Sequence, residues 1–160
     1  MSSFKIIQIS AKPVTEDERI SDFDLGEDDI INMRSDYIQS EKPWDDELGE
    51  RIRQELSAIA TVDIRKKTIT FLPKEILRKK CLDWVQKAVE DYKKDMGDKT
   101  CTVHHHRLQQ KIEDFFGIDS LFWGTGENEF AMTSGYVIDD YLSGLIPQKL
   151  YIGTVYTAHC

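Results

Sequence analysis

Apolar residues follow two different spacings along this chain, and each spacing predicts one kind of secondary structure. Short apolar or alternating runs rich in β-branched residues are typical of strands. Such runs cover residues 4–9, 61–65, 68–72, 120–123 and 149–157. The second and third runs are close enough to form a hairpin. Their turn lacks the glycine or asparagine that two-residue loops prefer, so a loop of three or four residues fits equally well.

Four other segments repeat apolar residues every three or four positions, which predicts amphipathic helices. These helices cover residues 44–59, 74–95, 104–116 and 135–145. Pro43 and the acids after it mark the start of the first helix, because proline is tolerated in a first turn and carboxylates favour the positive end of the helix dipole. The second helix is the longest, and we expect it to be the central helix of the core.

The segment 15–43 has a different pattern, with apolar residues scattered among acids and no sustained period. We interpret it as an acidic, irregular and partly extended segment, with one short strand at 29–34. The chain is expected to begin and end with a strand, at 4–9 and 149–157, and all the expected helices lie between these two.

This order of elements favours an α+β fold over a doubly wound one. We predict a single domain with a mixed or largely antiparallel sheet of about 4–5 strands packed against about 4 helices. The strand at 4–9, the hairpin and the strand at 149–157 should share one sheet, and we expect Ile6, Ile69 and Ile152 to meet in one hydrophobic cluster. A chain of 160 residues is long enough to bury such a core without disulfides.

Charge divides the chain into two blocks. Residues 15–50 hold fourteen acids and three bases, whereas residues 51–111 hold fifteen bases and eight acids. The net charge of −8 argues against direct binding to nucleic-acid phosphates or to an anionic membrane, because both need a positive surface. Either the two blocks pair within the fold, or one of them meets a partner.

Acids are densest between residues 22 and 29, at Asp22, Asp24, Glu27, Asp28 and Asp29. This run fails the EF-hand pattern, because Gly26 stands at the fifth loop position instead of the sixth and Met33 occupies the twelfth. The leading hypothesis is a noncatalytic binding or regulatory protein that presents these acids to a basic protein partner. If that partner handles nucleic acids, the carboxylates would stand in for phosphates.

A small enzyme or metal-binding protein is the alternative, and it depends on Cys101 and the three histidines His104–His106. Cys101, His104 and His106 are the weak candidate zinc ligands, and a histidine could also serve Cys101 as a base. Zinc sites usually carry two spaced pairs, whereas the second pair here, His159 and Cys160, is adjacent and would diverge in a strand. We therefore predict no bound zinc and no other cofactor.

Enzyme signatures are otherwise absent, since the chain lacks the Rossmann, P-loop and nucleophile-elbow patterns. A noncatalytic role is therefore the favoured prediction. The chain also lacks an apolar run of about 18 residues and a secretory leader pattern, and its three cysteines are scattered. We expect a soluble protein of the cytoplasm without disulfides.

Overall fold

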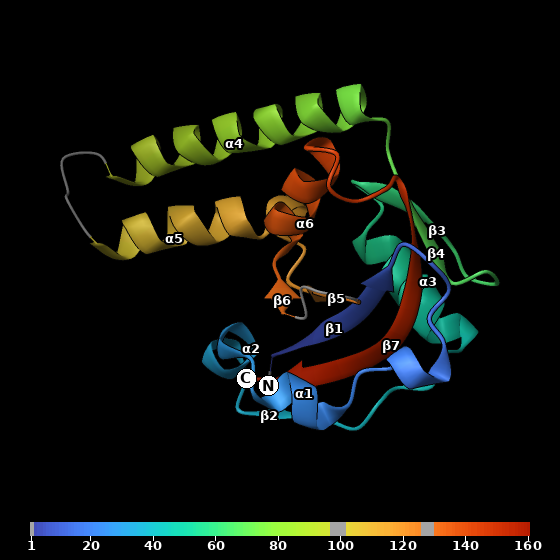
Figure 1. Cartoon of the computed structure of the whole chain (residues 1–160). Helices are drawn as coiled ribbons and strands as arrows, with labels where there is room; N and C mark the ends of the chain where they lie inside the picture. Colours follow the sequence, from blue (N-terminus) through green and yellow to red (C-terminus); the bar gives the residue numbers. More distant parts are fainter. Residues whose placement is uncertain (1, 97–101, 126–129) are drawn as a thin grey trace.

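A mixed β-sheet forms the centre of the molecule. The computed structural model describes residues 2–96, 102–125 and 130–160 (Figure 1). Within them, six of the seven strands follow the order β3-β4-β7-β1-β5-β6, and β2 also pairs with β7. β1 and β5 are parallel, and the other pairs are antiparallel. The strands are β1 Ser3–Ser10, β2 Tyr37–Ile38, β3 Ala60–Asp63, β4 Thr68–Phe71, β5 Leu121–Gly124, β6 Ala131–Met132 and β7 Lys149–His159.

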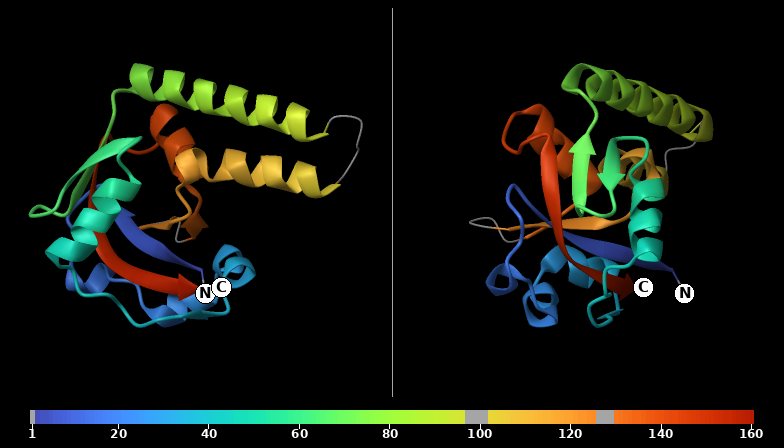
Figure 2. Two further views of the ribbon diagram at one scale, coloured as in Figure 1. Left: turned by 180° about the vertical axis from the view of Figure 1, so that it is seen from behind. Right: turned by 90° about the vertical axis from the view of Figure 1, so that its right-hand side faces the viewer.

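Helices cover both faces of this sheet (Figures 1 and 2). One face packs against α3, α4 and α6, and the other against the segment that carries α1 and α2. The helices are η1 Glu16–Glu18, α1 Asp22–Gly26, α2 Asp29–Arg34, α3 Asp46–Glu55, α4 Lys74–Met96, α5 Thr102–Glu113, η2 Phe115–Gly117 and α6 Ser134–Leu142. The predicted α+β fold is confirmed. The sheet has more strands than expected, because the two-residue strands β2 and β6 are too short to show a pattern.

β1 lies in the middle of the sheet, between β7 and β5, and is buried on both sides. Successive side chains of a strand point to opposite faces. Ile7 therefore joins the cluster beneath α3, α4 and α6, whereas Ile6 joins the cluster beneath α1 and α2. The expected single sheet is confirmed, but the expected single cluster is wrong, because Ile69 and Ile152 pack with Ile7 and not with Ile6.

Gln8 lies at a β-bulge in β1 and hydrogen-bonds to the segment 15–43. It is fully buried, and its amide oxygen accepts hydrogen bonds from the backbone N–H and hydroxyl of Thr154. Its amide nitrogen donates to the Glu18 carbonyl at 2.7 Å and to the Thr125 hydroxyl at 3.0 Å. The Gln8 side chain passes over Gly153, where an added Cβ would lie 2.4 Å from its oxygen. Only glycine leaves room for this crossing.

The long predicted helix exists as α4, but it is not the central helix of the core. Its described buried side chains are Leu77, Cys81 and Ala88, whereas Leu82 is 70% exposed. α4 runs beside α5, and the two helices project together beyond the edge of the sheet (Figures 1 and 2). Its apolar stripe is narrow, and only its first half reaches the sheet.

The strand expected at 29–34 is wrong, because these residues form helix α2. Asp28 caps this helix, and Ser21 caps the preceding helix α1. After α2 the chain extends along β7, and the backbone N–H groups of Gln39 and Lys42 donate to carbonyls of β7. The segment 15–43 is therefore a layer of short elements rather than an irregular stretch.

Candidate functional site

The five acids predicted to bind a partner lie together along two short helices, α1 and α2, and the two cap residues between them. We call Asp22, Asp24, Glu27, Asp28 and Asp29 the acidic surface. Leu25 of α1 and Ile31 of α2 are fully buried against the sheet. These two anchors hold the helices in place, and most of the acids therefore face solvent.

Two of the five acids have partners beyond an adjacent residue, whereas Asp22 accepts from the N–H of Phe23, the next residue along the chain. Asp24 accepts hydrogen bonds from the backbone N–H and the hydroxyl of Ser21, and these bonds lower the pKa of its carboxyl. One Asp28 oxygen accepts from the N–H groups of Ile30 and Ile31, and the other accepts from the N–H of Ala131 at 2.9 Å. Asp28 therefore caps α2 and ties it to β6.

The other three acids, Asp22, Glu27 and Asp29, are exposed. None of the ion pairs in the described part of the chain includes them. The acidic block does reach the basic block through Glu47–Arg51 and Glu50–Arg53, but each of these pairs joins neighbouring turns of α3. The charge of α1 and α2 is directed towards solvent.

The basic residues of α4 lie on the far side of the molecule from the acidic surface. α4 covers the face of the sheet opposite to α1 and α2, as Figure 1 shows. At physiological salt, charges separated by more than about 8 Å are largely screened from each other. The bases of α4 therefore do not neutralise the acidic surface.

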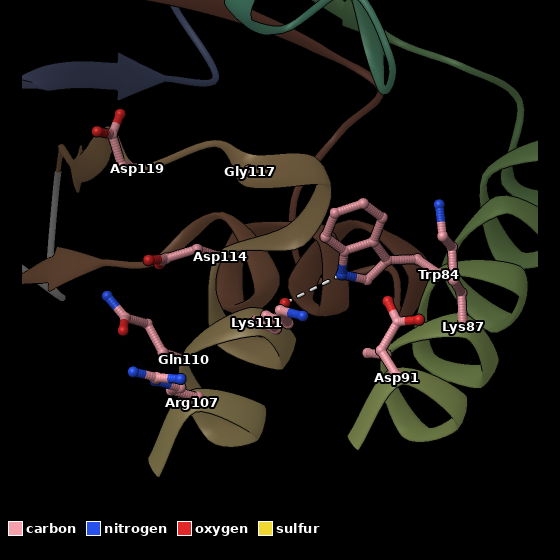
Figure 3. Close-up of a pocket in the computed structure, with 10 residues that line it drawn as sticks. Trp84, Lys87, Asp91, Arg107, Gln110, Lys111, Asp114, Gly117 and Asp119 are labelled. Atoms are coloured by element: carbon pink, nitrogen blue, oxygen red, sulfur yellow. Dashed lines mark hydrogen bonds between the residues drawn. The ribbon is translucent and has the colours of Figure 1, made fainter. Parts of the chain in front are cut away.

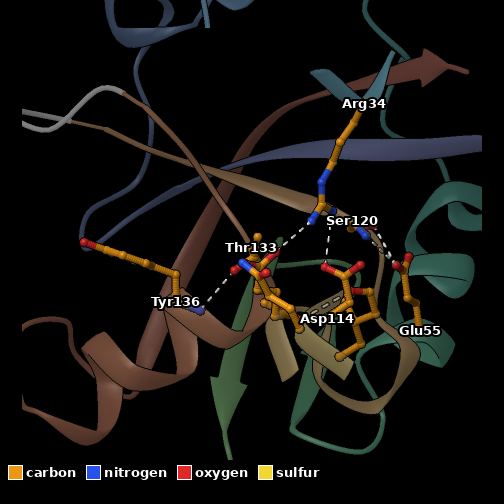
Figure 4. Close-up of polar contacts among 10 residues, drawn as sticks. Arg34, Glu55, Asp114, Ser120, Thr133 and Tyr136 are labelled. Carbon is orange, nitrogen blue, oxygen red and sulfur yellow. Dashed lines mark hydrogen bonds and ion pairs between the residues drawn. The ribbon is translucent and has the colours of Figure 1, made fainter. Parts of the chain in front are cut away.

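Arg34, at the end of α2, forms ion pairs with Glu113, the last residue of α5, and with Asp114, which follows it (Figure 4). Its guanidinium lies 3.2 Å from Asp114 Oδ1 and 3.7 Å from Glu113 Oε2. Burial raises the pKa of the Asp114 carboxyl, and the Arg34 charge opposes that rise. This pair holds the C-terminal end of α2 in place, while Asp28 holds its N-terminal end.

A groove of about 320 Å³ opens between α2, β6 and the start of α6. We call it the α2–α6 groove. Met33 of α2 is 87% exposed on one side, and Tyr136 of α6 is 54% exposed on the other. Phe130 packs edge-on against Tyr136, with ring centroids 6.0 Å apart. The lining residues are Ile30, Met33, Arg34, Glu113, Phe130, Ala131, Met132, Thr133 and Tyr136.

A second cavity, of about 450 Å³, lies between α4 and α5 (Figure 3). The Trp84 indole forms part of its wall, donates to the Lys111 carbonyl at 3.0 Å and packs against Phe116. Its lining contains three bases and three acids, and no serine, cysteine or histidine. This cavity offers an apolar surface with balanced charge, and its lining holds no serine–histidine or cysteine–histidine pair.

The candidate zinc ligands come from residues 101–106 and from the end of the chain. Cys101 and the side chains of His104 and His105 lie outside the described residues, and His106 is exposed. His159 stacks on Tyr37 with ring centroids 4.9 Å apart. Among the residues that the structure describes, no three histidine, cysteine or acidic side chains are grouped as metal ligands. The geometry gives the metal hypothesis no support from these residues.

The sequence pattern missed the α2–α6 groove altogether. Its residues come from α2, α5, β6 and α6, so no local spacing brings them together. One signal could have revealed α1 and α2. Ser21 and Asp24 stand three residues apart, as in a capping box, and Asp28 is a favoured N-cap residue before Ile30 and Ile31.

No helix among the described residues is long and apolar enough to cross a membrane. Comparison of the chain with models of protein families, with curated proteins and with solved structures found no match.

Proposed function

We propose that this protein is a noncatalytic binding protein that presents its acidic surface to a basic protein segment. The observation that carries this proposal is the state of Asp22, Glu27 and Asp29. They are exposed on helices anchored in the core, and no ion pair of the described residues relieves their charge. An ordered surface of one charge sign fits a partner of the opposite sign.

Such a surface acts mainly on the rate and selectivity of association. Complementary charges steer the encounter of two proteins and exclude partners with like charge. The anchors Leu25 and Ile31 fix the backbone that carries the acids, so little of it must be ordered on binding. We therefore expect binding that weakens steeply as salt is added.

The test is binding of a lysine-rich peptide, KKGAGKK, measured by calorimetry at low salt. The variant for this test is Asp22→Asn/Glu27→Gln/Asp29→Asn, which removes three exposed charges and leaves the hydrogen bonds of Asp24 and Asp28 intact. Exposed ion pairs contribute about 0.2–1 kcal/mol each, so affinity should fall about tenfold. Thermal stability should not change.

A matched control removes the same charge from the other side of the molecule. The control variant changes three exposed acids of α4, which are Glu75, Asp83 and Glu90. The control variant, with Gln or Asn at these positions, should bind the peptide as the wild-type protein does. Equal losses in the two variants would mean that only net charge matters, and the proposal would then be wrong.

A further inference from the structure

The α2–α6 groove adjoins the acidic surface, and the two share helix α2. Asp29 and Met33 stand four residues apart on α2, so they lie on one face about 6 Å apart along the helix axis. Asp28 accepts a hydrogen bond from Ala131, which lines the groove. The acids and the groove are therefore parts of one continuous surface.

The groove exposes large apolar side chains to solvent. Met33 is 87% exposed, Tyr136 54% and Phe130 37%. Exposed apolar surface of this kind, bordered by polar residues, marks sites of interaction. Pockets for small ligands measure about 300–1,000 Å³, and a groove of about 320 Å³ is at the lower end of that range. The volume of the groove fits one large side chain of a protein partner.

The charges around the groove favour a basic occupant. Arg34 is the one base in its lining, and it is already paired with Glu113 and Asp114. On α6, Asp139 and Asp140 follow Tyr136 by three and four residues, which places them one turn beyond it. With Asp29 on the α2 side, acids flank both walls of the groove.

We propose that the α2–α6 groove receives one large apolar side chain from a basic protein segment whose lysine or arginine residues bind the acids of α2. This inference rests on the proposed function, and it adds the kind of segment that is recognised. Because Asp29 and Met33 lie about 6 Å apart along α2, the apolar residue of the partner segment should stand one or two residues from a lysine or arginine in that segment. A buried apolar anchor inside a charged rim is the usual arrangement of a binding hot spot.

Two peptides test the inference by calorimetry: KKGWGKK, which carries a tryptophan, and KKGAGKK, which differs only in an alanine. We expect the wild-type protein to bind the tryptophan peptide about tenfold more tightly. The variant Met33→Gln/Tyr136→Ser should bind both peptides with the lower affinity. The control Leu82→Gln/Leu145→Ser, which changes apolar residues that are 70% and 75% exposed elsewhere, should keep the preference.

A second measurement does not depend on any variant. The methyl resonance of Met33, observed by NMR with labelled methionine, should shift on addition of KKGWGKK and stay nearly unchanged with KKGAGKK. Equal affinity of the wild-type protein for both peptides, with no selective shift of Met33, would overturn the inference and leave the proposed function standing. If neither peptide binds at low salt, the proposed function is wrong and the inference is wrong with it.

Discussion

Asp28 should be the one acid of the acidic surface whose loss strongly destabilises the fold. Its two oxygens have separate tasks, since one caps α2 at Ile30 and Ile31 and the other accepts from the N–H of Ala131. Asp28→Ala removes both interactions. Asp28→Asn keeps a capping oxygen but turns an amide NH₂ towards the Ala131 N–H, so two donors face each other.

The size of each effect follows from these contacts. Loss of an N-cap costs about 0.5–2 kcal/mol. A buried donor without a partner costs about 1–3 kcal/mol, and Ala131 is fully buried. We therefore expect Asp28→Ala to lower the free energy of unfolding by about 2–4 kcal/mol, and Asp28→Asn to lower it by about 1–3 kcal/mol.

Urea unfolding, followed by tryptophan fluorescence, measures these differences. The matched control is Asp29→Ala, one residue away, which removes an exposed carboxylate and should change the free energy by no more than about 0.5 kcal/mol. The slope of the free energy against urea should be similar in all variants. Equal midpoints for Asp28→Ala and Asp29→Ala would refute the assigned role of Asp28.

Three further predictions concern the core and the ion pairs of Arg34. Gly153→Ala brings a Cβ to 2.4 Å from the Gln8 amide oxygen, so urea unfolding should show a loss of about 1–3 kcal/mol, and an unchanged midpoint would contradict this crossing. Burial raises the pKa of the Cys81 thiol to about 11. Alkylation of Cys81 at pH 8, mapped by mass spectrometry, should therefore be about 100-fold slower in the native protein than in urea. Equal rates in the two conditions would contradict the burial of this thiol. Arg34→Met removes the charge that opposes the raised pKa of Asp114. The loss of stability relative to the wild-type protein should therefore grow as pH rises through the pKa of Asp114 and shrink as pH falls towards 3.8. A loss that does not depend on pH would contradict the pairing of Arg34 with Asp114.

The parts of the fold that the sequence predicts are those with a strong local pattern. β1, the hairpin of β3 and β4, and β7 are rich in β-branched residues, and the structure contains all of them. Helix α4 was also predictable, but its place was not, because local spacing does not show that only half of its stripe reaches the sheet. Helix α2 was missed since Ile30 and Ile31 are adjacent and suggest a strand, although Asp28 marks a cap.

The acidic surface was predictable as a group, whereas the roles of its members were not. The hydrogen bond from Ala131 to Asp28 joins residues 103 positions apart, and no local pattern contains it. The α2–α6 groove has the same origin, since Met33 and Tyr136 come from distant segments. Local sequence shows where charge accumulates, but long-range contacts decide which charges remain available to a partner.

The most direct test of the proposed function is an NMR titration that maps where a basic peptide binds. Backbone amide shifts should be recorded at low salt while KKGWGKK is added to the wild-type protein. We expect the largest shifts between residues 22 and 34 and between 130 and 136, and we expect them to diminish as salt rises. Shifts centred on the cavity between α4 and α5, or an absence of shifts at low salt, would contradict the role proposed for the acidic surface.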